Sequence, residues 1–186
     1  GRFERPQDAQ AAVQEALRVS PRDADALNMQ ASILHMQGDL QAALREYGRA
    51  LEVRPEHLDA RLAQAGILLD LQLDSELKDD LDYLQHNFAY DPRGAYLRAL
   101  NYSRQGDEAR ARTALQEATR TLSQLAPEFL AASDQLQLLG GLAHHALGEF
   151  ERAKTYLGAY LDKHPRDVGA RKLLALSEKN KVVLQV

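Results

Sequence analysis

Small and large apolar residues recur at fixed intervals along the chain and predict pairs of helices. In residues 36–55, MQGDLQAALREYGRALEVRP, an acid follows a glycine, an alanine stands five residues after the glycine, and a large apolar residue follows four positions later. Residues 104–119 (RQGDEARARTALQEAT) and 146–165 (ALGEFERAKTYLGAYLDKHP) repeat this order. Apolar residues spaced by three and four positions form one face of a helix. Each segment therefore predicts a helix that begins after a glycine turn.

Prolines mark the boundaries of the same units. The segments RVSPRDADAL (18–27), EVRPEHLDAR (52–61) and DKHPRDVGAR (162–171) each carry a proline, a few polar residues and the start of a helix. Pro55 follows Pro21 by 34 residues. A period of that length with two helices in each copy resembles the tetratricopeptide repeat, whose copies stack as antiparallel helix pairs. The resemblance implies an all-α fold, a right-handed superhelical solenoid of about ten helices.

The copies differ in how completely they follow the repeat. We expect a single domain over residues 1–186 that is a fragment of a longer chain. The complete copies cover residues 24–57, 92–125 and 134–167. A degenerate copy covers residues 58–91, where Gln72 replaces the turn glycine and Leu77 replaces the small alanine. Two partial copies and an insertion fill the rest: residues 7–20, residues 126–133 (the insertion) and residues 168–180, a partial copy or capping helix.

Small residues at repeated positions predict close packing between the helices of a pair. Such residues let the partner helix approach at Ala31, Ala65, Ala99, Gly141, Ala43, Ala111 and Ala153. Large residues such as Leu34 and Leu157 fill the space that remains, at spacings of three and four. Gly38, Gly106 and Gly148 are expected to end the first helix of their copies in a left-handed turn, which glycine adopts at low cost.

Two neighbouring histidines, His144 and His145, are the first candidates for a metal or catalytic site. Side chains of consecutive helical residues point about 100° apart, so these two cannot bind one ion together. The repeat places His144 at the packed position that Leu34 holds in the first copy, and His145 on the inner side. We therefore expect one half-buried histidine, one surface histidine and no metal site.

Composition supports a helical fold and removes several classes of function. Helix-forming Ala, Leu, Arg, Glu and Gln dominate, while Val, Ile and Thr are few. The net charge is −4 and no basic run is present, so we expect no nucleic-acid partner. No stretch approaches about 18 apolar residues, so this segment is not expected to insert into a membrane. Cysteine is absent, and no catalytic, phosphate-binding or metal-binding motif occurs, so we expect neither enzyme activity nor a cofactor.

The first helices of stacked pairs line the inner, concave side of such a fold. Their inner positions mix apolar, aromatic and basic residues, which suits an extended or helical segment of a protein or peptide partner. The predicted partner-binding surface comprises Asn28, Met29, Ser32, His35, Leu62, Arg93, Tyr96, Leu97, Leu100, Arg104, Leu138, Leu142 and His145. Alternatively, the leucines fill a tight superhelix or cover a neighbouring helix. The lysines with which some tetratricopeptide domains grip a terminal carboxylate are missing, because those positions hold Asn28, Ser32, Leu62 and Gly66.

Two longer segments resemble a narrower family. Residues 135–175 and residues 80–100 are similar to the tetratricopeptide lipoprotein of PEP-CTERM/exosortase systems. The shared residues include Gly140, Gly141, His144, Leu147, Gly148, Tyr160, Pro165, Gly169, Ala170, Arg171, Lys172, Pro127 and Glu128. The resemblance implies a periplasmic, outer-membrane-anchored lipoprotein of Gram-negative bacteria, linked to exopolysaccharide production and export; the alternative is a cytoplasmic protein. The lipid-bearing cysteine of that family is absent from this sequence.

These features favour a non-enzymatic scaffold that binds a protein partner in its concave groove, in a bacterial envelope exopolysaccharide export system. The alternative is a structural spacer within a longer lipoprotein, with no specific ligand on this segment. Polysaccharide binding ranks lower, because Tyr96 is the one clear aromatic platform on the inner face. Self-association through exposed end helices is also expected, because end repeats without their neighbours expose packing surface.

Overall fold

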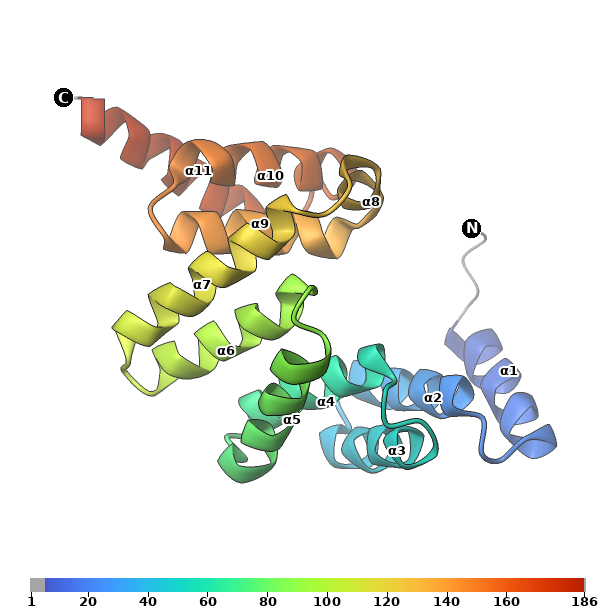
Figure 1. Cartoon of the computed structure of the whole chain (residues 1–186). Coiled ribbons are helices and arrows are strands. Elements are labelled where there is room, and N and C mark those ends of the chain that lie inside the picture. The colour runs from blue at the N-terminus through green and yellow to red at the C-terminus, as the bar shows by residue number, and fades with distance from the viewer. Residues whose placement is uncertain (1–5, 186) are drawn as a thin grey trace. The chain divides into compact units, whose positions relative to one another are not determined.

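The computed structural model describes residues 6–185, with side chains through residue 180. Eleven α-helices and no strand lie within those residues (Figure 1). The all-α stack of antiparallel helix pairs predicted from the sequence is confirmed. The helix beyond the expected ten is α8 (Pro127–Ala132), which lies in the insertion.

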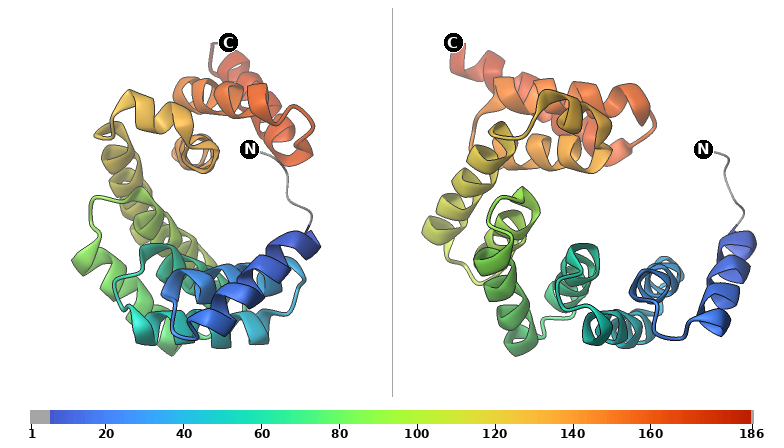
Figure 2. Two further views of the ribbon diagram at one scale, coloured as in Figure 1. Left: turned by 90° about the vertical axis from the view of Figure 1, so that its right-hand side faces the viewer. Right: turned by 45° about the vertical axis from the view of Figure 1, so that its right-hand side comes forward.

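The chain divides into two compact units after Asn87. The N-terminal unit, Gly1–Asn87, contains α1 (Pro6–Val19), α2 (Ala24–Met36), α3 (Leu40–Val53), α4 (Leu58–Asp70) and α5 (Asp74–Asn87). Helices α2 and α3 form one pair and α4 and α5 the next, while α1 packs on α2 and α3 packs on α4. Helices α2 and α4 also touch, so the first helices of the two pairs are neighbours (Figure 2).

The C-terminal unit, Phe88–Val186, holds the remaining helices. They are α6 (Pro92–Arg104), α7 (Glu108–Ser123), α8 (Pro127–Ala132), α9 (Asp134–Ala146), α10 (Phe150–Lys163) and α11 (Val168–Gln185). Helices α6 and α7 form one pair and α9 and α10 the next, with the short α8 against α9. Helix α9 touches α6, α7, α10 and α11, which makes it the centre of this unit.

Glycine turns end three of the first helices, as the sequence predicts. Gly38, Gly106 and Gly148 have φ angles of +82°, +81° and +77°. In each turn, the glycine N–H donates to the carbonyl three residues earlier and the next N–H donates to the carbonyl five residues earlier, at 2.9–3.0 Å. Gln72 takes the same place in the degenerate copy with φ +56°, and the same two hydrogen bonds form there at 3.2 and 3.0 Å. This turn therefore forms without glycine, in a conformation that costs a residue with a β-carbon free energy.

Acidic residues after the glycine turns begin the second helices. The carboxylates of Asp39 and Asp107 each accept a hydrogen bond from the backbone N–H three residues later, at 3.2 and 3.1 Å. A cap of this kind stabilises a helix by about 1 kcal/mol because it satisfies an otherwise unpaired N–H group. Glu149 makes no cap hydrogen bond, and its carboxylate instead lies 3.1 Å from Nδ1 of His144.

Close approach within the pairs depends on the small residues. Ala31, Ala43 and Ala153 have no exposed surface. A β-carbon on Gly141 would lie 2.5 Å from Cδ2 and 2.6 Å from Cγ of Leu157, so any larger residue there would force this fully buried side chain to move. The spacing of small and large residues read from the sequence is therefore the packing that the structure uses.

Helix α11 is longer than the partial copy expected over 168–180, because it continues to Gln185. Its Ser177 is fully buried, and the Ser177 hydroxyl donates to the Leu173 carbonyl at 3.0 Å and lies 2.9 Å from Nδ1 of His145 on α9. Ala170 joins the buried cluster of Ala153 and Leu157 on α10. The last helix therefore packs on both helices of the pair that precedes it.

Candidate functional site

In the N-terminal unit, the predicted surface residues gather on α2. Three half-buried residues and one exposed residue belong to this helix: Asn28, Ser32, His35 and Met29. Met29 is 52% exposed. Burial raises the pKa of the Tyr47 phenol, and a hydrogen bond with Ser32 partly offsets that effect, so Ser32 is engaged with the core. Leu62 is half-buried on α4, the helix that contacts α2.

In the C-terminal unit, the predicted residues divide among separate neighbourhoods. Tyr96 and Leu100 on α6 line a hollow against α7 and α9. Arg93, at the start of the same helix, points elsewhere: its guanidinium binds the carboxylate of Asp91 at 2.7 Å and donates to Oε1 of Gln135 at 3.3 Å. Leu97 is half-buried and Arg104 is exposed. The residues of one predicted surface therefore face at least two different places on this unit.

The predicted residues of α9 serve packing within the C-terminal unit. Leu138 packs against the buried cluster that joins α10 and α11. His145 is half-buried between Ser177 of α11 and the ring of Phe150, whose centroid lies 5.4 Å away in an edge-on arrangement. Burial lowers the pKa of this imidazole. Leu142 is half-buried.

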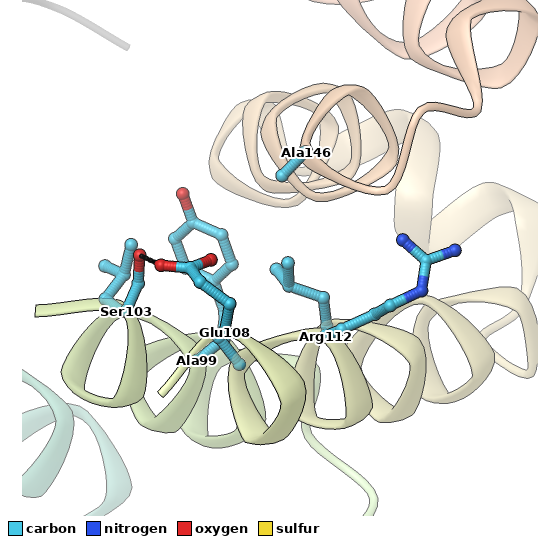
Figure 3. A pocket seen from close by; sticks show the side chains of 9 residues that line it. Ala99, Ser103, Glu108, Arg112 and Ala146 are labelled. Carbon is cyan, nitrogen blue, oxygen red and sulfur yellow. Dashed lines mark hydrogen bonds between the residues drawn. The ribbon is translucent and has the colours of Figure 1, made fainter. Parts of the chain in front are cut away.

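A hollow of about 300 Å³ lies between α6, α7 and the C-terminal end of α9 (Figure 3). Nine residues line it: Tyr96, Ala99, Leu100, Ser103, Glu108, Ala111, Arg112, Leu115 and Ala146. Figure 3 shows Ala146 on α9 facing Glu108 and Arg112 across the space. We call this space the inner hollow.

The apolar wall of the inner hollow combines a fixed ring with an accessible side chain. Tyr96 packs against the buried cluster that contains Leu136 and Leu139, and burial raises the pKa of its phenol. Leu100 is 39% exposed beside it. Exposed leucine next to an immobilised aromatic ring is a surface that gains free energy when an apolar group covers it, by roughly 25 cal/mol for each Å² buried.

Polar groups stand on two sides of the inner hollow. The Ser103 hydroxyl donates to Oε1 of Glu108 at 3.3 Å, which holds this carboxylate on one side (Figure 3). The Arg112 guanidinium lies on the other side and forms no ion pair within the described part of the chain. The hollow therefore offers an apolar floor with an open cation beside it, which suits an apolar side chain and a carboxylate on the same segment.

The structure buries both histidines more than the sequence predicts. The surface position expected for His145 is wrong, because Ser177 of α11 and the ring of Phe150 lie against it. His144 is 4% exposed, and its ring stacks on Tyr156 with centroids 5.4 Å apart. His145 points toward Ser177 of α11, whereas His144 packs on Tyr156 of α10. Among the residues that the structure describes, no group of three or more His, Cys, Asp or Glu could hold a metal ion.

Sequence reasoning missed Glu108, Arg112 and Ala146 as lining residues of the inner hollow. It assigned the inner surface to first helices alone, whereas Glu108 and Arg112 belong to the second helix α7. A signal was present: these two polar residues stand four positions apart, on the helix face next to the small Ala111 and the large Leu115.

Comparison with protein families identifies the repeat. The family model of the tetratricopeptide repeat matches residues 1–51, 37–92 and 138–178, which together cover more than half of the chain. No curated protein matches the sequence. No helix in residues 6–185 combines the length and apolar character that crossing a bilayer requires.

Solved structures with the same fold have low sequence identity to this chain. One is in the crystal structure of the APC/C hetero-tetramer Cut9–Hcn1, with a TM-score of 0.70, 18% identity, and coverage of 95% of this chain and 34% of that one. A tetratricopeptide repeat protein from Parabacteroides merdae has a TM-score of 0.56 and 18% identity, and the match covers 95% of this chain and 67% of that one. YrrB, described as a TPR protein with an unusual peptide-binding site, has a TM-score of 0.53 and 18% identity, and the match covers 91% of this chain and 84% of YrrB. At these identities the likeness shows the fold alone.

Proposed function

The chain belongs to the tetratricopeptide repeat family, and from that premise we propose that it is a non-enzymatic scaffold that binds a segment of a protein partner. Proteins of this repeat are generally binding scaffolds, and YrrB carries a peptide-binding site on the same fold. The inner hollow is the proposed contact point in the C-terminal unit. The predicted residues on α2 and α4 are proposed as a partner-contacting surface of the N-terminal unit.

The observation that carries this proposal is the pairing of Leu100 with Arg112 at one hollow. An apolar side chain in the hollow would cover Leu100 and the Tyr96 ring, while an acidic group on the same segment would meet the guanidinium. Charge-assisted hydrogen bonds to arginine are stronger than neutral ones and fix orientation. The preferred partner segment is therefore apolar and acidic.

A structural spacer is the alternative function. In that case the repeats set a distance inside a longer protein, and the inner hollow stays open to solvent. Polysaccharide binding at the inner face ranks lower, because Tyr96 is half-buried against the core and presents only part of its ring.

The cellular setting is a further proposal, which rests on sequence resemblance alone. Residues 135–175 and 80–100 are similar to the tetratricopeptide lipoproteins of PEP-CTERM/exosortase systems. On that basis we place the protein in the periplasm of a Gram-negative bacterium, anchored to the outer membrane and associated with exopolysaccharide export; a cytoplasmic location is the alternative. Two other proposals are independent of that setting. Residues 1–186 are a fragment made of complete, degenerate and partial copies of the repeat. The end helices α1 and α11 self-associate, because end repeats without their neighbours expose packing surface. Sedimentation velocity over a range of concentrations tests the self-association.

A peptide selection tests the scaffold function. A displayed library of random peptides is selected on the wild-type chain, and the enriched peptides are titrated against a Leu100→Asp/Arg112→Glu variant. We expect at least about a tenfold loss of affinity, because both the apolar contact and the cation are reversed. A Leu73→Asp/Arg45→Glu variant is the matched control, since it makes the same chemical changes at exposed residues of the N-terminal unit outside α2 and α4, and Leu73 is 38% exposed. Equal binding by both variants would exclude the inner hollow as the contact point, and failure to enrich any peptide would favour the spacer.

A further inference from the structure

The insertion between α7 and α9 builds a second pocket, which shares no lining residue with the inner hollow. This pocket has a volume of about 150 Å³ and lies where the segment before α6 meets α8 and the start of α9. Hydrogen bonds hold α8 in place, because the Ala131 carbonyl accepts from Nζ of Lys163 at 3.0 Å and from Nε2 of Gln137 at 3.4 Å. The insertion is therefore a fixed wall of the pocket.

Two exposed aromatic rings flank this pocket. Tyr90 is 64% exposed and Phe129 is 59% exposed, whereas Pro92 and Leu136 below them are buried. Phe88 braces Tyr90, with ring centroids 6.1 Å apart. Exposed large aromatic side chains beside a preformed cavity gain free energy when a ligand covers them, and aromatic residues are enriched where proteins bind partners.

The charged groups of the pocket neutralise each other. Arg93 donates to both carboxylate oxygens of Asp91, at 3.0 and 2.7 Å, and both side chains are mostly buried. The Arg93 guanidinium also donates to Oε1 of Gln135 at 3.3 Å. Three donors are left over within the described residues: the Tyr90 hydroxyl, the Gln135 amide nitrogen and the Ser133 hydroxyl donate no hydrogen bond there, although Oγ of Ser133 accepts one from the Leu136 N–H. The pocket therefore favours a neutral ligand that supplies accepting oxygens.

We propose that this pocket binds an extended, proline-containing segment of a protein. In the polyproline II conformation the backbone makes no internal hydrogen bonds, so its carbonyls remain free to accept from Tyr90 and Gln135. Proline rings lie flat against aromatic side chains, and grooves lined with aromatic residues recognise such segments at low entropic cost. A sugar fits less well, because its hydroxyls need acceptors and most of the acceptor capacity here is in use: the Asp91 carboxylate accepts three hydrogen bonds from Arg93, and Oε1 of Gln135 accepts a fourth.

Binding of a fluorescein-labelled oligoproline peptide to the whole chain tests this proposal. Fluorescence anisotropy should give a saturable curve, with backbone amide shifts in NMR spectra at residues 88–93 and 127–135. Tyr90→Ala/Phe129→Ala should weaken binding about tenfold or more, since both rings are removed. Tyr90→Phe keeps the ring and removes only the hydroxyl, so it should weaken binding a few-fold, by about the value of one hydrogen bond.

Two controls separate this site from other surfaces. Val19→Ala/Met36→Ala truncates two apolar side chains of the N-terminal unit that are more exposed than Tyr90 and Phe129, at 71% and 77%, and should leave oligoproline binding unchanged. Leu100→Asp/Arg112→Glu should also leave it unchanged, so failure of this proposal is distinct from failure of the scaffold function. Three results would overturn the proposal: no saturable oligoproline binding at millimolar concentration, binding that survives loss of both rings, or a neutral oligosaccharide that binds in a ring-dependent way instead.

Discussion

The turn at Gln72 offers a direct test of how the repeat is stabilised. Gln72 stands at φ +56°, where the three other turns of this type have glycine at +77° to +82°. A residue with a β-carbon pays about 1–2 kcal/mol in the left-handed region. Glycine avoids that cost but gains freedom in the unfolded chain, which offsets about 0.5–1 kcal/mol. We therefore expect Gln72→Gly to stabilise the N-terminal unit by about 0.5–1 kcal/mol.

Urea denaturation followed by circular dichroism at the helical band measures this effect. The transition midpoint of the N-terminal unit should rise at an unchanged slope, because the exposed area does not change. Gln72→Ala is the control that keeps the β-carbon, and it should leave the midpoint nearly where it was, since the exposed Gln72 side chain forms no hydrogen bond within the described residues. Gly106→Ala should act in the opposite sense by about 1 kcal/mol, as a β-carbon there meets no atom within 4 Å and only backbone strain remains. If Gln72→Gly proves neutral or destabilising, the argument from backbone strain is wrong.

Three further predictions follow from individual contacts. Gly141→Ala places a β-carbon 2.5 Å from the Leu157 side chain, so it should destabilise the C-terminal unit by about 1–3 kcal/mol in a urea titration. Gly66→Ala is the control: its β-carbon meets nothing within 4 Å, so it should be neutral or stabilising. Hydrogen bonds from Arg54 and His57 lower the pKa of the Asp25 carboxyl in the folded protein. Its contribution to stability is therefore present above the pKa of the unfolded chain and is lost as the pH falls through the pKa of the folded protein. Between pH 5 and about pH 3, the urea midpoint should drop less in Asp25→Asn than in wild type. Burial lowers the pKa of the His145 imidazole, so as the pH falls the unfolded chain binds a proton at this residue before the folded protein does. Stability should therefore decline as the pH falls below about 6.5. If the stability of a His145→Gln variant declines just as steeply, other groups cause the dependence.

The helices and their turns could be predicted from the sequence because their causes are local. Gly38, Gly106 and Gly148 end helices through their own backbone freedom, and Asp39 and Asp107 cap the next helices through hydrogen bonds three residues away. The alternation of small and large residues also predicted the pairing, since small residues at the contact let two helices approach closely and large residues fill the space beside them. The helix in the insertion was not counted, because a six-residue segment has too few apolar positions to show a period.

The candidate site depended much more on tertiary structure. Tyr96 and Leu100 were predicted from their helix positions, but the repeat alone could not show that Tyr96 braces the next pair while Leu100 stays open. Nor could it show that Arg93 turns away to Asp91, or that α11 covers His145. Such outcomes depend on which side chains of other helices arrive at the same place.

By itself, the sequence determined that this protein is a stack of helix pairs, where each pair begins and ends, and which small residues lie at the contacts. It did so because periodicity, capping and glycine turns act over a few residues. Only the tertiary structure decided where open surface remains: the inner hollow with Leu100 and Arg112, and the pocket between Tyr90 and Phe129. Open surface is what packing leaves uncovered, so it depends on contacts between residues far apart in the chain.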